Sequence, residues 1–270
     1  MKTLPSYHHD KRPPAWSLLI LFSTAIIALC CVTKRVAAAE KQAPFSPGEK
    51  LTYQLNWGFI PAGEAALEVL PMETIDGKPV YHFVATAKSN AFVDVFYTVR
   101  DRVDAYVDTD VTHTVFFKKK QREGKTRRDV VVNFDWGKME AQYSNFNQKI
   151  KPISILPGTL DPLSAFFHVR LRDLKPNQKI ERPVTDGKKC VVGIARVIKK
   201  EKMKLLGKTY DTYVLEPELK HIGGIFEKSK DAKIRLWVTA DERRILLKVK
   251  SKVKIGSFTG ELISATSIGE

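Results

Sequence analysis

Most of this chain alternates apolar and polar residues, and this period of two constrains its fold more than any other feature. The pattern runs through segments such as LTYQLNWGF (51–59) and KPVYHFVATAKS (78–89), which are bounded by turn residues. Alternation is typical of strands that bury one face, because successive side chains point to opposite sides of a sheet. The dipeptides at 76–77 and 186–187 are both Asp-Gly, which is typical of tight hairpins. The sequence therefore predicts a mainly β protein of about twelve antiparallel strands.

Residues 156–170 interrupt the alternation and predict one helix in the middle of the chain. Asp161 is a favourable N-cap, and Pro162 suits the first helical position because its missing N–H costs nothing there. The apolar stripe that follows has to cover an apolar surface, which only the inner face of a curved sheet provides. We therefore expect a curved antiparallel sheet or half-open β-barrel with this helix as plug or lid. The stripe comprises Leu163, Phe166, Phe167, Arg170, Leu171 and Leu174.

Arg170 is the exception within this stripe because it is charged. Its stem could cover the core while the guanidinium reaches water, or the guanidinium could pair with a nearby carboxylate. The functional hypothesis instead places Arg170 at a cavity, where the anionic head group of a bound amphiphile would satisfy its charge. On this hypothesis the ligand-binding residues of cavity and lid are Phe166, Phe167, Arg170, Leu171 and Leu174.

The first 39 residues have the features of an export signal. Basic residues precede an apolar run at 16–32, and three alanines follow at 37–39. We expect cleavage after the last alanine; the alternative is an uncleaved N-terminal membrane anchor, because the run is about as long as the shortest membrane-spanning helix. Residues 40–48 are then a linker and residues 49–270 a single β-rich domain. In either case the expected location is the periplasm or the cell envelope.

The chain is strongly basic, with 45 Lys and Arg against 30 Asp and Glu, and its cations gather around a predicted turn at Glu123 and Gly124. Cations at a solvated hairpin tip commonly discourage edge pairing. The alternative is docking on anionic phospholipid or lipopolysaccharide, to which each cation contributes about 1 kcal/mol. Nucleic acid is an unsuitable partner for an exported protein, and no aromatic ladder accompanies the charges. The docking residues would be Lys118, Lys119, Lys120, Arg122, Lys125, Arg127 and Arg128.

The sequence contains no motif of a nucleophile elbow, zinc protease, dithiol redox site or phosphate loop. Cys190 is the one cysteine outside the leader, and it is interpreted as a small buried hydrophobe. The histidines at 82, 113, 168 and 221 are widely spaced. We therefore expect a protein that is not an enzyme, with no catalytic residue, no metal site and no cofactor.

Three segments carry a resemblance to a known family: PGEKLTYQLNWGFIPAGEAALEV (47–69), DPLSAFFHVR (161–170) and WVTADERRILLKVKSKVKIGSFTGEL (237–262). Together they resemble the family called domain of unknown function 3108, over nearly all of residues 45–266. Its members are typically exported bacterial envelope proteins. The resemblance also implies a looser likeness to half-open β-barrels such as the periplasmic lipoprotein carriers. It implies a curved sheet with a helix across its mouth, and it implies no reaction.

Two functions remain open. The first is a non-enzymatic periplasmic or envelope protein that binds a lipid, lipoprotein or other amphiphile in a half-barrel. The second is a structural or adaptor protein of the envelope, with a packed core and a basic hairpin that docks a partner. Apolar residues that face a ligand and apolar residues that face a core alternate in the same way, so the pattern alone does not choose between them.

Overall fold

The computed structural model describes residues 43–218, 233–253 and 256–266 of the 270-residue chain. The predicted signal or anchor at 1–39, the first residues of the predicted linker and His221 lie outside this range. Most of the described residues are in strands, which are β1 (Lys50–Trp57), β2 (Ile60–Ile75), β3 (Lys78–Ser89), β4 (Arg100–Asp108), β5 (Thr114–Glu123), β6 (Thr126–Asp135), β7 (Glu140–Asn145), β8 (Gln148–Lys149), β9 (Ile153–Ser154), β10 (Lys179–Thr185), β11 (Cys190–Leu205), β12 (Lys208–Pro217), β13 (Lys233–Thr239), β14 (Leu246–Val253) and β15 (Gly256–Thr266).

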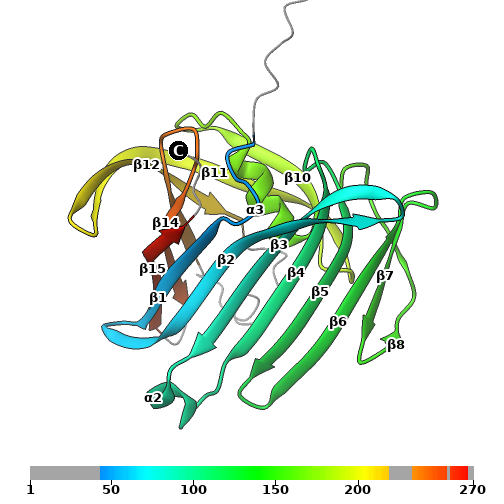
Figure 1. Ribbon diagram of the computed structural model, residues 1–270, viewed down its shortest axis with the longest axis horizontal. Helices are drawn as coiled ribbons and strands as arrows, with labels where there is room; N and C mark the ends of the chain where they lie inside the picture. Colours follow the sequence, from blue (N-terminus) through cyan, green and yellow to red (C-terminus); the bar gives the residue numbers. More distant parts are fainter. Residues whose placement is uncertain (1–42, 219–232, 254–255, 267–270) are drawn as a thin grey trace, which may run out of the picture. The chain divides into compact units, whose positions relative to one another are not determined.

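All fifteen strands belong to one antiparallel sheet, in the order β10-β11-β12-β13-β14-β15-β1-β2-β3-β4-β5-β6-β7-β8, with β9 beside β7. The sheet curves strongly but its two end strands do not pair within the described residues, so it is a half-open barrel (Figure 1). The predicted fold class is therefore confirmed. The predicted count of about twelve strands was too low. Strands β8 and β9 have two residues each, too few for an alternating pattern.

The two predicted Asp-Gly hairpins differ. Asp76 and Gly77 have φ of 50° and 74° and join β2 to β3 as a two-residue turn, as expected. At 186–187, in contrast, the strands end at the Thr185–Cys190 pair, which leaves a four-residue loop. The Thr185 hydroxyl closes this loop by accepting from the Gly187 N–H and donating to the Lys189 carbonyl. That local bonding replaces the tight turn.

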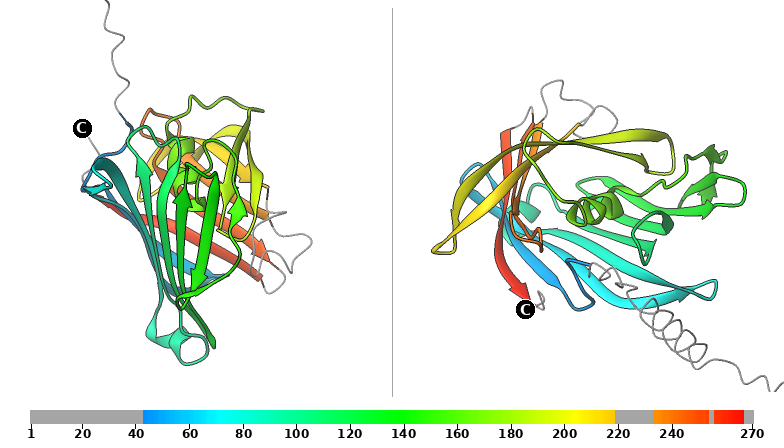
Figure 2. Two further views of the ribbon diagram at one scale, coloured as in Figure 1. Left: turned by 90° about the vertical axis from the view of Figure 1, so that its right-hand side faces the viewer. Right: turned by 90° about the horizontal axis from the view of Figure 1, so that it is seen from above.

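Helix α3 (Pro162–Arg170) lies inside the curve of the sheet, as the view from above shows (Figure 2). Its predicted start is confirmed: Asp161 is the N-cap and Pro162 begins the helix. It ends at Arg170, earlier than the apolar spacing predicted, so that Leu174 lies in the turn beyond it. A second helix, α2 (Ala91–Asp94), was not predicted. None of the described helices is long and apolar enough to cross a membrane.

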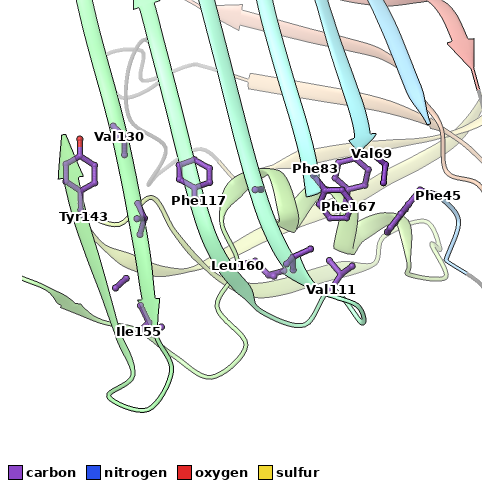
Figure 3. Packing of buried hydrophobic residues seen from close by; sticks show 14 residues of the cluster. Phe45, Val69, Phe83, Val111, Phe117, Val130, Tyr143, Ile155, Leu160 and Phe167 are labelled. Carbon is purple, nitrogen blue, oxygen red and sulfur yellow. The ribbon is translucent and has the colours of Figure 1, made fainter. Parts of the chain in front are cut away.

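The core consists of two clusters of buried side chains on the concave face of the sheet. One gathers on β2 to β7 around Phe83 and Phe167, whose ring centroids are 3.8 Å apart (Figure 3). The other lies on β10 to β15 and β1, and includes Leu174. Phe166 packs against both clusters. Helix α3 therefore joins the two halves of the core.

Candidate functional site

Asp161 anchors the start of α3. Its buried carboxylate accepts four hydrogen bonds: two come from the backbone N–H groups of Leu163 and Ser164, and two from the hydroxyls of Ser164 and Thr114. Thr114, at the start of β5, also accepts from the Asp161 N–H at 2.7 Å. Burial raises the pKa of the Asp161 carboxyl, although these hydrogen bonds favour its ionised form. The helix is thus bonded to the sheet at its N-terminus.

Arg170 anchors the other end of α3. Its guanidinium donates to both carboxylate oxygens of Glu49, at 2.5 and 3.0 Å, and to the carbonyls of Pro44 and Arg243. Both side chains of the pair are about 98–99% buried, and the guanidinium lies 5.2 Å from the ring of Phe45. This geometry corrects the expectation of an anion-binding arginine at a cavity. It corresponds to the structural alternative, a pair with a nearby carboxylate.

The other four residues proposed for the cavity and lid separate into two groups. Phe167 and Leu174 are buried in the core, where they contact protein rather than open space. Phe166 and Leu171 are half-buried. With both ends bonded to the sheet, α3 has the geometry of a fixed plug, and only Phe166 and Leu171 of the five remain at the edge of the packed region.

Beyond α3, the concave face of β2 to β4 carries a strip of small and aliphatic side chains. Strand pairing places Leu67 opposite Ala85 and Ala85 opposite Val103, and it places Ala65 opposite Ala87. Paired residues of antiparallel strands point to the same side, here the side of buried Phe83. All five are half-buried although they are apolar. We call these residues, Ala65, Leu67, Ala85, Ala87 and Val103, the concave strip.

Polar residues end the concave strip toward the β5–β6 turn. Asp101 pairs with Ala87, and Lys119 pairs with Val103. The pKa of Asp101 is raised from 3.8 to about 6, mainly by partial burial and to a smaller extent by a hydrogen bond with Glu123. Gln121 lies on the same face, and its Oε1 is buried with no hydrogen-bond partner in the described part of the chain.

The basic hairpin of β5 and β6 was predicted as one docking patch, but the strand register divides it between two faces. Lys119 and Arg128 point to the concave side, in line with buried Phe117 and Val130. The other strand cations, Lys118, Lys120, Arg122 and Arg127, point to the convex side, and Lys125 is in the turn. The alternation of the sequence already contained this signal, because residues 118 to 122 have to alternate in direction.

The convex face has its own groove, of about 400 Å³, over β1 to β5. Thr52, Ala66 and Thr86 line it, together with five cations, Glu64 and atoms of Ala65, Ala87 and Asp101. The cations are Lys50, Lys88, Arg100, Arg102 and Lys120. Four of these form ion pairs, with Glu68, Glu64, Asp94 and Asp104 respectively. The cations of this groove are therefore largely neutralised.

The histidines and the cysteine lie apart. His82 is held between Glu73 and Asp104 on the convex face, at 2.8 and 2.9 Å. His168 bonds to the Val111 carbonyl, and burial lowers its pKa. Cys190 is half-buried. The described residues contain no group of three His, Cys, Asp or Glu side chains placed to hold a metal ion.

A family model described as "Protein of unknown function (DUF3108)" matches residues 52–263, which confirms the resemblance seen in the sequence. Among solved structures, a similar one is the crystal structure of a β-barrel-like protein of domain of unknown function DUF1849 from Brucella abortus. Its TM-score is 0.51 and its sequence identity 11%, over 80% of this chain and 96% of that chain. A likeness at this identity shows the fold alone. A comparison with curated proteins found no match.

Proposed function

This chain belongs to the DUF3108 family, and from that premise we propose that it is a non-enzymatic envelope protein that holds one acyl chain of an amphiphile on its concave face. The single observation that carries the proposal is the concave strip. Five apolar side chains lie on the inner face of the half-barrel and stay partly exposed, beside a core whose central residues, such as Phe83 and Ala105, are fully buried. Burial of such surface by an acyl chain is favourable at about 25 cal/mol per Å².

The composition of the strip suits a linear chain. Three of its five residues are alanines, and Gly63 extends the row of small residues on the same face, next to Ala65. Small side chains take up little room on this face of the sheet, and we place the acyl chain between them and Phe166, which packs against both core clusters. The ligand therefore lies along the sheet beside α3, and α3 does not open.

The polar end of the strip supplies a place for the head group. Lys119 and Arg128 point to the concave side there, and Lys119 acts on Asp101 closely enough to lower its pKa against the dominant effect of burial. An anionic head group placed there would be stabilised by electrostatic attraction to these two cations. The role first assigned to Arg170 thus passes to Lys119 and Arg128.

The adaptor alternative rests on a different observation. Helix α3 is bonded at both ends, and Phe167 stacks closely on Phe83. A half-barrel with a fixed plug can also serve as a rigid support for a partner protein. The two functions differ in whether the concave strip takes up a ligand.

A fluorescent fatty acid, used below its micellar concentration, tests the proposal. We expect saturable binding to the parent protein and at least tenfold weaker binding to Ala87→Trp, because the indole would fill the concave strip. Thr86→Trp is the matched control, since Thr86 is the neighbouring residue of β3 and strand alternation points its side chain to the convex side, opposite to Phe83 and Ala85. It should bind as the parent does. Lys119→Gln should weaken binding of the fatty acid but not of the uncharged fatty alcohol.

Either of two results would contradict the proposal: a parent protein with no saturable binding, or two Trp variants that bind equally. The first result would favour the adaptor.

A further inference from the structure

Large apolar side chains are exposed at the end of the half-barrel where β1 and β3 finish. Phe59, in the turn between β1 and β2, is fully exposed. Val95 and Phe96, which follow α2, are 77% and 76% exposed, and Phe92 within α2 is 61% exposed. Because these side chains stay exposed in the folded protein, the fold lacks several kcal/mol of hydrophobic stabilisation that their burial would give. We call Phe59, Ile60, Phe92, Val95 and Phe96 the apolar tip.

The apolar tip is one surface although it comes from two segments. Asn90 is the N-cap of α2 and accepts from the Val93 N–H. Its side-chain amide donates to the Pro61 carbonyl at 2.7 Å, and its N–H donates to the Ala62 carbonyl at 2.9 Å. One residue therefore fixes α2 against the β1–β2 hairpin. Figures 1 and 2 show α2 beyond the ends of the strands.

A row of cations crosses the convex face next to this tip. In the strand register, Lys88 of β3 lies opposite Arg100 of β4, and Arg122 of β5 lies opposite Arg127 of β6. Arg100 and Arg122 fall opposite each other, between the Val99–Glu123 bridge and the Arg102–Lys120 pair. Adjacent strands are about 4.8 Å apart. Like charges placed directly opposite one another destabilise a sheet. We call Lys88, Arg100, Arg122 and Arg127 the cation row.

Only half of the cation row is neutralised. Lys88 forms an ion pair with Glu64 at 2.9 Å, and Arg100 forms one with Asp94 at 2.5 Å. In the ranges that the structure describes, no carboxylate forms an ion pair with Arg122 or Arg127. The positive charge of these two residues is therefore not neutralised within the described ranges, although the Arg127 guanidinium donates to the carbonyls of Gly124 and Thr126 in the β5–β6 turn.

The cation row and the apolar tip are in direct succession. Lys88 lies one residue before the end of β3, and Arg100 begins β4, with α2 between them. The β5–β6 turn is fixed against the same segment, because the Gly124 N–H donates to the Thr98 carbonyl at 2.9 Å. Gly124 has φ of +51°, and a Cβ there would lie 2.5 Å from the Tyr97 ring, so glycine is required.

We propose that this end of the half-barrel docks on an anionic phospholipid bilayer, with Phe59, Phe92 and Phe96 in the interfacial region and the cation row at the phosphates. The apolar tip projects beyond the cation row. This order matches a bilayer, in which the phosphates lie outside the acyl chains. The complementary charge of the lipid would relieve the repulsion within the row. This inference does not depend on ligand binding by the concave strip.

The test has to be local to the apolar tip, because residues 16–32 of the full chain are themselves apolar. Phe96→Trp places an indole in the tip, and Met72→Trp places one at the far end of β2, where Met72 is 41% exposed. We expect vesicles of phosphatidylcholine and phosphatidylglycerol to shift the added emission of Phe96→Trp to the blue, and brominated lipid to quench it. Relative to the parent, with its four native Trp, Met72→Trp should show neither change.

The cation row is tested by Arg122→Gln with Arg127→Gln, in the background of Phe96→Trp. Two cations at about fivefold each predict roughly 25-fold weaker partition into the anionic vesicles. Lys78→Gln with Lys208→Gln removes the same charge from two exposed positions in other hairpins and should change partition little.

Three results would overturn the proposal. One is an indole at position 96 that vesicles do not affect. Another is equal partition into vesicles of phosphatidylcholine alone. The last is an equal loss of partition in the two charge variants, which would indicate a net-charge effect with no defined docking row.

Discussion

Arg170 and Glu49 form an ion pair within the core, where neither charge reaches water. The residues are 121 positions apart, and Glu49 comes directly before β1. Arg170 is recognisable in the sequence as a charged residue within an apolar stripe, but its partner is not, because helical spacing says nothing about contacts over such a separation. The pair fastens the end of α3 to the start of the sheet.

We predict that Arg170→Met lowers the free energy of unfolding by about 3–5 kcal/mol, because the carboxylate of Glu49 would remain buried without its partner. Urea denaturation measures this loss. Arg172→Met, at an exposed arginine two residues later, is the control and should change stability by less than about 0.5 kcal/mol. The double variant Glu49→Leu with Arg170→Met should be more stable than Arg170→Met alone. Equal stability of the Arg170 and Arg172 variants would contradict the buried-pair account.

Asp101 gives the polar end of the concave strip a pH dependence. Its pKa is raised from 3.8 to about 6, first by burial and then by Glu123. The folded protein therefore binds this proton more tightly than the unfolded chain, so stability falls as the pH rises from about 4 to about 6. Asp101→Asn keeps an acceptor for the Arg122 N–H and carries no charge. Its stability advantage over the parent should grow across that window and stay constant above it.

Unfolding free energies measured between pH 4 and 8 test this prediction. Asp110→Asn, at an exposed aspartate in the β4–β5 turn, should run parallel to the parent. A constant difference between Asp101→Asn and the parent at all pH values would exclude a raised pKa.

At the scale of the element, α3 shows where periodicity succeeds and where it fails. Its N-cap and its first residue follow from local chemistry at Asp161 and Pro162, and both were predictable. Of the predicted stripe, Phe167, Arg170 and Leu174 are buried and the other three residues are half-buried. Ser164, which bonds to Asp161, is buried although it was not predicted to be. Helix α2 was missed because four residues are too few to show a helical period and none of them is buried.

The difference between Phe167 and Phe166 tests the description of α3 as a plug. Phe167 is fully buried and stacks on Phe83, so Phe167→Ala should cost about 3–5 kcal/mol of unfolding free energy. Phe166 is half-buried at the boundary of the two clusters, so Phe166→Ala should cost clearly less. Chemical denaturation of both variants measures the difference. A loss of unfolding free energy for Phe166→Ala that equals or exceeds the loss for Phe167→Ala would contradict the description of α3 as a plug whose Phe167 face is the packed one.

At the scale of the whole molecule, the alternating pattern predicted the half-open sheet because side-chain direction follows directly from residue spacing. The same rule could have assigned Lys119 and Arg128 to the concave face, given that Phe117 is apolar. The concave strip could not be located in advance, since Ala65, Ala87 and Val103 come from three strands and only the register brings them together. The apolar tip was hidden for a related reason: its exposed residues lie in strand-like sequence.

Native mass spectrometry of protein purified from envelope extracts tests most directly whether the concave strip holds an acyl chain. Collisional release and fragmentation would identify any bound molecule. We predict that the parent and Thr86→Trp carry one acyl-chain amphiphile each and that Ala87→Trp is measured at the mass of the polypeptide alone. A parent at the bare polypeptide mass, or a ligand retained by Ala87→Trp, would contradict the account.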